Sequence, residues 1–535
     1  MKLIFYSETG PVSAHGIQGF LSKFGLPSDF ITTSKVIQIV NEDSHVQEKT
    51  ICRGLIEFET LKVPVFLIPK DLSRYGTPRA MYQGGGTQFP CITQTDDSIY
   101  VGFDFFYHRG IILSGEHEKI WGGEWTNERC SLLKDPFIDQ IDDLIFTLLK
   151  NVYQNEGLFL IHKTDWPDGK PLAVCLTHDV DETRKTYQWI TYPFRLLKKL
   201  DGKGVINQIK SFAKKIRGAE PYWTFETILE IEKEAGAVSS FYFLHEKSPV
   251  RILDRKTWRH LGRRYNWHAP DIASLIRSLE RRGWEVGLHG SFDSFTNGEK
   301  IHQEKRELEQ ILGETVTGIR QHNLNLSIPA TWLYHEKEHF LYDSTLGSNR
   351  CTGFRWGTSH AFRPFYLHGK RSINVLEIPL IIEDIPFFRC PDPWGDFLLL
   401  FNKTSHYHGI LTLLWHPAVL NSLEYPDWSG AYKKILEYCK ENNGWITNGR
   451  EIARWWHKRE AVTVQWEYTG SVLIITLTGE IPPGFNLCIC NPHNTGISSV
   501  NNAILTETGI NSPPIIRIEP GIAERKVITA CVQRK

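Results

Sequence analysis

Two aspartates directly follow a short apolar run in the second quarter of the chain. The segment reads LTHDVD and covers residues 176–181. In an extended strand, residues two apart point to the same side, so Asp179 and Asp181 are expected to share one side. Two carboxylates this close both stay ionised at little cost only when a cation lies beside them. The segment therefore indicates a metal site, although the same acids could instead cap a following helix.

Three further segments end an apolar run with an imidazole or a guanidinium group. His289 follows one run, and Asp293 stands four residues later, a spacing that lets both reach one ion if a helical turn forms. Arg320 and His322 follow a second run, and His416 follows a third. A single histidine after a strand is usually structural, but polar groups at four strand ends together indicate a shared site.

Parallel strands are needed to bring these residues together, and the sequence from Pro171 onward predicts them. Strands are expected over residues 172–176, 239–244, 284–288, 316–320, 373–378 and 410–415. Helices are expected over 223–234, 302–312 and 271–282, the last with Asp271 as its N-cap. Repeated strand–helix units indicate an α/β barrel or a doubly wound sheet, and barrel enzymes gather catalytic groups at the carboxyl ends of the strands.

Taken in order, the four segments resemble the motifs of the polysaccharide deacetylase superfamily (NodB homology, carbohydrate esterase 4-like), in the branch whose first motif reads T-H-D-V-D. The resemblance covers residues 170–455. It implies a deformed (β/α) barrel. It also implies metal-dependent hydrolysis that removes N-acetyl or O-acetyl groups from a sugar or polysaccharide.

The resemblance also implies a role for each matching residue. Asp179 corresponds to the general base and Asp181 to a metal ligand. His289 resembles the first histidine of the family's H-x-x-x-H motif, a second ligand. Arg320 resembles the arginine that orients the base, and His416 the histidine that protonates the leaving amine.

The chain departs from the family pattern at the third ligand. Asp293 stands where the motif has its second histidine, and His322 stands where the family usually has proline. Either side chain could complete a divalent-metal site, for which zinc is the expected ion. A site with two aspartates and one histidine would bind harder ions relatively better than the usual set does.

Three more residues are expected around the substrate. A backbone N–H near Asn323 would stabilise the oxyanion, and Trp356 could stack on a sugar ring or pack on the barrel. Glu377 is a weaker candidate for the acid that holds the imidazole of His416. The sequence has no G-x-S-x-G segment and no cysteine–histidine motif, so a covalent nucleophile is not expected.

The segments on either side of the barrel have different patterns. Residues 1–165 predict an N-terminal α/β domain of unknown role, with strands over 2–6, 63–68 and 98–103 and a helix over 135–153. Residues 166–458 form the predicted barrel. Alternating residues after Glu460 predict a small all-β module over 459–535.

Composition limits the partners that this chain is expected to have. Its 61 Lys and Arg balance 61 Asp and Glu, which argues against a nucleic-acid-binding protein. The sequence shows neither a secretory segment nor an integral membrane segment, and ten scattered cysteines form no paired CxxC motif, so a cytoplasmic location is expected. A basic run over residues 195–215 could approach an anionic glycan or a membrane, although a solvated helix face is the simpler interpretation.

Three functions therefore remain open at this point. The leading one is a cytoplasmic, zinc-dependent deacetylase with a carbohydrate substrate. A second is a hydrolase of another non-peptide C–N bond on the same scaffold. A third is a glycan-binding barrel without catalysis, because Asp293 replaces an expected histidine. Metal content and acetate release would distinguish these functions.

Overall fold

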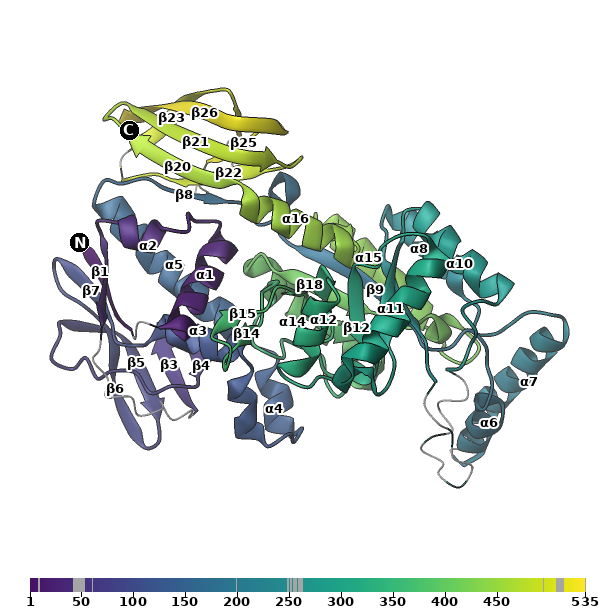
Figure 1. Ribbon diagram of the computed structural model, residues 1–535. Coiled ribbons are helices and arrows are strands. Elements are labelled where there is room, and N and C mark those ends of the chain that lie inside the picture. The colour runs from purple at the N-terminus through teal and green to yellow at the C-terminus, as the bar shows by residue number, and fades with distance from the viewer. Residues whose placement is uncertain are drawn as a thin grey trace.

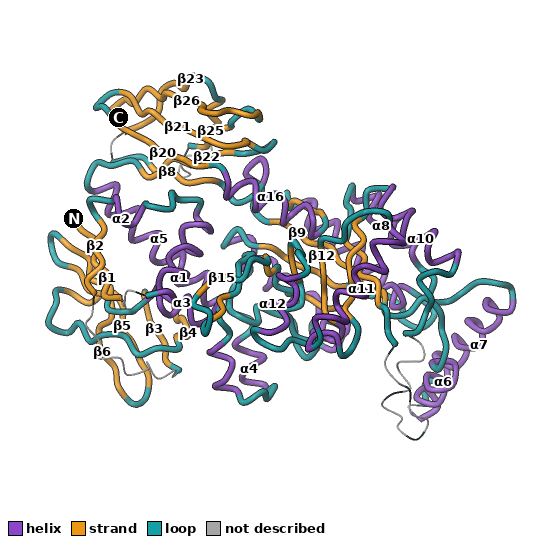
Figure 2. Tube along the Cα trace, viewed as in Figure 1, coloured by secondary structure: helices purple, strands orange, loops and turns teal. Residues whose placement is uncertain are grey.

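The computed structural model describes residues 1–7, 10–41, 53–59, 61–198, 200–247, 250, 253, 257, 263–493, 495–506 and 514–534. Figure 1 shows an N-terminal α/β domain, a central barrel surrounded by helices, and a C-terminal β-module. Figure 2 shows the same arrangement by secondary structure, with the strands of the N-terminal domain and of the C-terminal module toward one end of the molecule.

A seven-stranded mixed sheet forms the N-terminal domain, in the order β2-β1-β7-β6-β5-β3-β4. Its strands are β1 (Lys2–Ser7), β2 (Ile37–Asn41), β3 (Gly54–Phe58), β4 (Leu61–Val65), β5 (Thr77–Gly84), β6 (Thr87–Gln94) and β7 (Ser98–Val101). Its helices are α1 (Pro11–Phe24), α2 (Phe30–Thr33), α3 (Phe105–Leu113), α4 (Asn127–Leu132) and α5 (Phe137–Asn155). The helix predicted over 135–153 is α5, which begins two residues later because Pro136 is its N-cap.

The central sheet has nine strands, and all pairings between its named strands are parallel. They are β9 (Ala173–Val180), β10 (Ser240–Leu244), β11 (Glu285–Gly290), β12 (Gly318–Gln321), β13 (Tyr342–Asp343), β16 (Leu376–Glu377), β17 (Ile382–Glu383), β18 (Ile410–Leu414) and β19 (Trp445–Thr447). The first strand, β9, pairs with β10 and β19 along one side and with the late strand β18 along the other, as the circular order of a barrel requires. Every residue of β9, β10 and β11 is buried, which is typical of parallel strands covered on both faces. The predicted α/β barrel is confirmed, and it is open between β16 and β17 in the described residues.

Ten helices follow the N-terminal domain in the described residues. They are α6 (Gln188–Lys198), α7 (Gly202–Ile216), α8 (Phe225–Ala235), α10 (Pro270–Arg281), α11 (Gly298–Leu312), α12 (Ala330–Lys337), α13 (Asp384–Arg389), α14 (Pro393–His406), α15 (Trp428–Glu441) and α16 (Gly449–Ala461). A short hairpin of β14 (Phe365–Tyr366) and β15 (Arg371–Ser372) contacts α1 and α3 of the N-terminal domain. The prediction of Asp271 as an N-cap was wrong, because Pro270 already occupies the first turn and Ala269 is the cap.

Two four-stranded sheets make up the C-terminal module, in the orders β20-β21-β26-β23 and β24-β25-β22-β8. Its strands are β20 (Thr463–Tyr468), β21 (Val472–Ile481), β22 (Asn486–Cys490), β23 (Thr495–Asn501), β24 (Ile504–Thr506), β25 (Ile515–Arg517) and β26 (Gly521–Arg534), joined by β8 (Leu160–Lys163). Strand β8 comes from the segment before residue 165, yet it pairs with β22. The domain boundary expected at residue 165 would therefore assign β8 to the N-terminal domain, although its sheet belongs to the C-terminal module.

A disulfide joins the N-terminal domain to the barrel. It links Cys130, in α4, to Cys351, and it spans 221 residues of sequence. Disulfides persist in oxidising compartments, so this bond does not support the expected cytoplasmic location, which stays a prediction.

Candidate active site

Four strands of the barrel deliver polar side chains to one edge of the sheet. Asp179 lies near the end of β9, and Asp181 follows that strand directly. His289 in β11 lies opposite Arg320 in β12, and His416 follows the end of β18. The strand ends that carry polar residues therefore lie at one edge, as the sequence pattern predicts.

Arg320 fixes the carboxylate of Asp179. Its Nη1 donates to Asp179 Oδ1 at 3.0 Å and to Thr177 Oγ1 at 2.7 Å. Its Nε and Nη2 donate to the carbonyl and hydroxyl oxygens of Ser344, each at 2.8 Å. Because these bonds hold the guanidinium in one orientation, Asp179 Oδ2 is left to face His289 Nε2, which lies 3.6 Å away.

Asp181 lies between two imidazole rings. Its Oδ1 is 3.3 Å from His289 Nε2, and its Oδ2 is 3.8 Å from His322 Nε2. His289 Nδ1 lies 2.9 Å from the carbonyl oxygen of Arg320. A carbonyl only accepts hydrogen bonds, so Nδ1 carries the proton and the Nε2 atom of a neutral ring presents its lone pair to the carboxylates.

The chemistry of this group fits a divalent cation. Asp181 Oδ1 and both ring nitrogens of His322 are buried and have no hydrogen-bond partner among the described residues. Buried polar atoms are normally paired, and unpaired ones point to a missing ligand. Two imidazoles and a carboxylate are also a ligand set that zinc accepts.

The electrostatics of the three side chains agree with this fit. Burial lowers the pKa of His322 to about 4. The negative charge of Asp181 raises this pKa, but by less than burial lowers it. This ring is therefore neutral near pH 7 and offers a lone pair. Burial also lowers the pKa of His289, but Asp179 and Asp181 outweigh that effect and raise it above its ordinary value. The carboxylates of Asp179 and Asp181 thus favour a positive charge beside His289 Nε2.

Two residues that the sequence did not indicate complete the surroundings of Asp181 and His322. Arg263 Nη2 lies 3.1 Å from Asp181 Oδ2. Glu246 Oε2 lies 3.8 Å from His322 Nδ1. Glu246 comes two residues after β10, so the strand-end pattern that identified the other residues could have identified it. No comparable pattern marks Arg263.

His416 is paired with a buried acid on the other side of the cavity. Its Nδ1 lies 3.0 Å from Asp384 Oδ2, and its backbone N–H donates to the same oxygen at 2.6 Å. Burial lowers the pKa of His416, but the charge of Asp384 outweighs it and raises the pKa to about 10. The imidazole is therefore protonated near neutral pH and can donate a proton.

Glu377 is not the acid that holds His416. Its Oε2 accepts from the indole N–H of Trp332 at 2.8 Å, and its Oε1 accepts from the backbone N–H of Leu346 at 2.9 Å. The expectation was wrong because Asp384, the first residue of α13, reaches His416 from the end of β17.

Two adjoining cavities share these residues. A smaller one, of ≈ 80 Å³, is lined by Asp179, Asp181, His289, His322, Asn323, Glu383 and His416 among others. A larger one, of ≈ 340 Å³, is lined by Asp179, Asp181 and His416, and continues to residues of α6. Together they form a cleft with the acidic and imidazole groups at its base and α6 at its side.

The structure does not bring two of the expected site residues into these cavities. Asp293 is exposed at the start of a short 3-10 helix and lines neither cavity, whereas His322 lines the smaller one. Trp356 is 0% exposed. Its indole donates to Glu118 Oε1 at 2.9 Å, and its ring packs against Trp332 between the N-terminal domain and the barrel. A ring buried in this way cannot stack on a sugar.

Comparisons with known proteins give matches among solved structures. No family model and no curated protein matches the chain. It is similar to a candidate polysaccharide deacetylase from Mycobacterium smegmatis, with 20% identity and a TM-score of 0.36 over 55% of this chain and 93% of the other. A candidate polysaccharide deacetylase from Pseudomonas aeruginosa has 14% identity and a TM-score of 0.36 over 55% and 94% of the two chains. A CE4 family pseudoenzyme from Bacillus anthracis has 12% identity and a TM-score of 0.28 over 54% and 66%.

Proposed function

We propose that this chain is a zinc-dependent deacetylase that hydrolyses the N-acetyl group of a sugar or polysaccharide. One observation carries the proposal. Asp179, held by Arg320, faces the same cavity as His416, held by Asp384, and the unpaired atoms of Asp181 and His322 lie beside them. A proton acceptor, a proton donor and a cation site thus share one cleft.

Asp181, His289 and His322 would hold the metal. When bound, the ion would polarise the acetyl carbonyl and lower the pKa of a water to about 7. Asp293 is not needed for this set, because His322 supplies the second imidazole. Arg263, 3.1 Å from Asp181, balances the negative charge of that carboxylate.

The residues around the ion have separate tasks in amide hydrolysis. Asp179 accepts the proton of the attacking water, and Arg320 holds its carboxylate in one orientation. The backbone near Asn323, which lines the cavity, lies where an oxyanion could be stabilised. His416 then donates its proton to the sugar nitrogen as the C–N bond breaks, so that acetate and an amine leave.

Two substitutions test these roles. We expect Asp179→Asn and His416→Ala each to lower the rate of acetate release from N-acetylhexosamine oligomers by about 2 to 4 orders of magnitude, the usual contribution of an acid–base group. Asp293→Asn is the matched control, because its exposed side chain lines neither cavity. Near-normal turnover of a purified Asp179→Asn or His416→Ala variant would remove that residue from the mechanism.

One contact favours the alternative of a glycan-binding barrel without catalysis. Arg263 already places a positive charge against Asp181, where the metal would bind. Metal analysis of the purified protein separates the two functions. About one divalent ion per chain that Asp181→Ala removes, with activity lost on chelation and regained with zinc, supports the hydrolase. Bound glycan, with a metal content that Asp181→Ala leaves unchanged, supports the binding protein. Bound metal without acetate release from any sugar would instead favour another C–N bond as the substrate.

A further inference from the structure

Helices α6 and α7 form a hairpin that extends away from the barrel (Figure 1). Fifteen large apolar side chains are exposed among the described residues, and eight of them lie in this hairpin. They are Ile190, Phe194, Leu197, Leu200, Ile206, Ile209, Phe212 and Ile216. Exposed apolar groups gathered in one place usually mark an interaction surface.

The polarity of α7 is the reverse of that of an ordinary surface helix. Its buried residues are Gln208 and Ser211, whereas Ile209 and Phe212 are more than half exposed. Gln208 Oε1 accepts from the buried ammonium of Lys185, which fixes the polar side of α7 against the protein. A surface helix normally turns its apolar side toward the core. This helix is therefore held with its apolar side outward.

The apolar side of α6 follows the same pattern. Ile190, Phe194 and Leu197 recur at intervals of four and three residues, so they share one face of the helix, and all three are exposed. Leu196 is the buried residue of this helix. Both helices of the hairpin thus present exposed apolar residues.

Positive charge accompanies these apolar residues. Residues 188–217 contain eight Lys and Arg and one acidic residue, Asp201. The carboxylate of Asp201 caps α7 by accepting from the backbone N–H of Gly204 at 2.8 Å. An amphipathic helix with an apolar face and basic flanks lies in the interface of a bilayer that contains anionic lipids.

We propose that the α6–α7 hairpin docks on the surface of an anionic lipid bilayer, with its apolar face at the boundary between headgroups and acyl chains. The chain would lie on the bilayer, and in the described residues no helix is long and apolar enough to cross one. Gln188, Thr191 and Arg195 of α6 line the larger cavity, so docking brings that cavity to the bilayer surface. If the proposed deacetylase function holds, this placement favours, as substrates, sugars that are carried at a membrane surface.

Vesicle sedimentation tests the docking without any assay of activity. We expect the full chain to sediment with phosphatidylcholine vesicles that contain phosphatidylglycerol, and much less with pure phosphatidylcholine vesicles. Ile209→Gln with Phe212→Gln should weaken binding at least about tenfold, because each change removes a large apolar side chain from the interface. The matched control is Ile68→Gln with Ile504→Gln, which removes exposed apolar groups outside the hairpin and should bind as the parent does.

Three outcomes would overturn the docking proposal. The first is equal binding by the hairpin variant and the parent, and the second is no binding by the parent. The third is a dimer in analytical ultracentrifugation that the hairpin variant dissociates, without vesicle binding, which would assign the face to a second copy of this chain. Since the substituted side chains are exposed, circular dichroism should show the fold unchanged in every variant.

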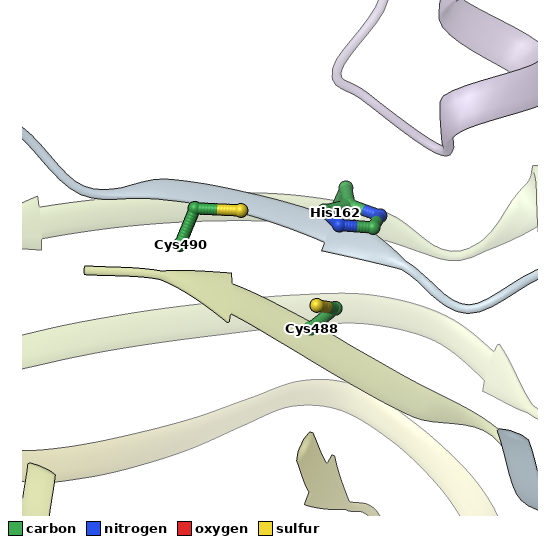
Figure 3. A group of neighbouring side chains, drawn as sticks. All are labelled: His162, Cys488 and Cys490. Atoms are coloured by element: carbon green, nitrogen blue, oxygen red, sulfur yellow. The ribbon is translucent and has the colours of Figure 1, made fainter. Parts of the chain in front are cut away.

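A separate cluster of metal-binding side chains lies in the C-terminal module. His162 in β8 pairs directly with Cys488 in β22, and Cys490 follows two residues later (Figure 3). One ring nitrogen and the two sulfur atoms all lie within 4.8 Å of one another. The two cysteines are buried, and His162 is half-buried. This cluster is distant in sequence from the residues of the candidate active site.

Strand geometry favours a shared ion over a disulfide for the two cysteines. Same-face positions on one strand are about 6.5 Å apart along the strand, whereas a disulfide needs Cβ atoms about 3.8 Å apart. An ion with bonds of about 2.3 Å to sulfur and about 2.0 Å to nitrogen can bridge the wider separation. Leu487 and Ile489 lie in the core of the module, whereas Cys490 lies in the core that contains α5. The thiols therefore face the N-terminal domain.

We infer that His162, Cys488 and Cys490 bind a thiophilic divalent ion such as Zn²⁺, with a fourth position left for water or another ligand. Thiolate sulfur and imidazole nitrogen are the ligands that zinc prefers in proteins. The ring of His162 also packs against Phe146 of α5, with centroids 5.1 Å apart. An ion at this point would fasten β8 to β22 beside the N-terminal domain.

Cobalt substitution distinguishes this cluster from the candidate active site. The ligands expected in the active site are nitrogen and oxygen, so only the cluster can give a thiolate-to-Co²⁺ charge-transfer band in the near ultraviolet. We expect this band in the parent and in Cys531→Ser, which removes an exposed thiol of the same module, and its loss in Cys488→Ser and Cys490→Ser. Zn²⁺ should also protect Cys488 and Cys490 of the parent from alkylation, which tests the site without a variant. Absence of both the band and the protection, or a band kept in the two variants, would overturn the inference.

Discussion

At the scale of single residues, each acid–base group of the candidate site is oriented by a buried partner of opposite charge. Arg320 contacts Asp179, and Asp384 contacts His416. Arg320 holds the carboxylate of Asp179 in one orientation, and Asp384 keeps His416 protonated before any substrate binds. The site is therefore organised for proton transfer by its own side chains.

Removal of the Asp384 charge should shift the pH dependence of activity. Asp384 raises the pKa of His416 to about 10, against the opposing effect of burial. In Asp384→Asn the pKa of His416 should fall by more than one unit, so the alkaline limb of kcat/KM should move to lower pH. A pH–rate profile from pH 6 to pH 11 measures the shift.

The same pair should affect stability. The pKa of His416 in the folded protein lies above its ordinary value, so its contribution is fully present below about pH 6.5 and is lost as the pH rises toward about 10. Asp384→Asn should remove this pH dependence of the free energy of unfolding, which urea denaturation across that range would detect.

The activity profile has its own contradicting outcome. An alkaline limb of kcat/KM that is unchanged in Asp384→Asn would show that His416 is not the group whose titration limits activity.

At the scale of elements, helix α16 joins the barrel to both neighbouring parts of the chain. Arg459 near its end is fully buried. The guanidinium donates to the backbone carbonyls of Ser22, Lys23 and Thr164 at 2.7, 2.9 and 2.8 Å. One side chain thus satisfies carbonyl groups from α1 and from the segment after β8.

Substitution of Arg459 should destabilise the whole protein. In Arg459→Ala several buried carbonyls lose their donor and a cavity forms, so we expect a loss of about 3 to 5 kcal/mol in the free energy of unfolding. Arg454→Ala on the same helix is the control. The Arg454 side chain is exposed, and among the described residues its hydrogen bond and ion pair are with Glu451. Its cost should be about 0 to 1 kcal/mol. Equal urea midpoints for the two variants would contradict this role of Arg459.

At the scale of the whole molecule, a buried ionic cluster joins the N-terminal domain to the barrel. Asp139 of α5 accepts from Lys23 Nζ at 2.9 Å. It also accepts from the hydroxyl of Thr358 at 2.8 Å and from the backbone N–H of Ser359 at 2.7 Å. Burial raises the pKa of Asp139, but Lys23 and His360 outweigh that effect and lower it below its ordinary range. The two parts therefore share an interior.

This shared cluster predicts that the domain and the barrel unfold together. Asp139→Asn should lower the free energy of unfolding by about 3 to 5 kcal/mol, because Lys23 then lacks part of its buried counter-charge. Far-ultraviolet circular dichroism and tryptophan fluorescence should report one coincident transition at a lower denaturant concentration. Asp29→Asn, at an exposed position, should change the free energy by less than about 0.5 kcal/mol. Separate transitions for the two probes would instead show independent domains.

The sequence by itself determined the residues at the strand ends. Asp179, Asp181, His289, Arg320 and His416 each follow an apolar run, and local periodicity is enough to locate such runs. Because parallel strands in a barrel have their carboxyl ends at one edge, the sequence also predicted that these residues lie together. The alternation of strands and helices likewise predicted an α/β barrel or a doubly wound sheet, and the family resemblance implied the barrel.

Only the tertiary structure decided which partners those residues have. Asp384 lies 32 residues before His416, and Arg263 approaches Asp181 from a distant segment. His322 enters the cavity while Asp293 stays exposed, and β8 pairs with a strand more than 300 residues later. These contacts depend on how loops and domains pack, and packing between segments distant in sequence leaves no periodic pattern in either of them.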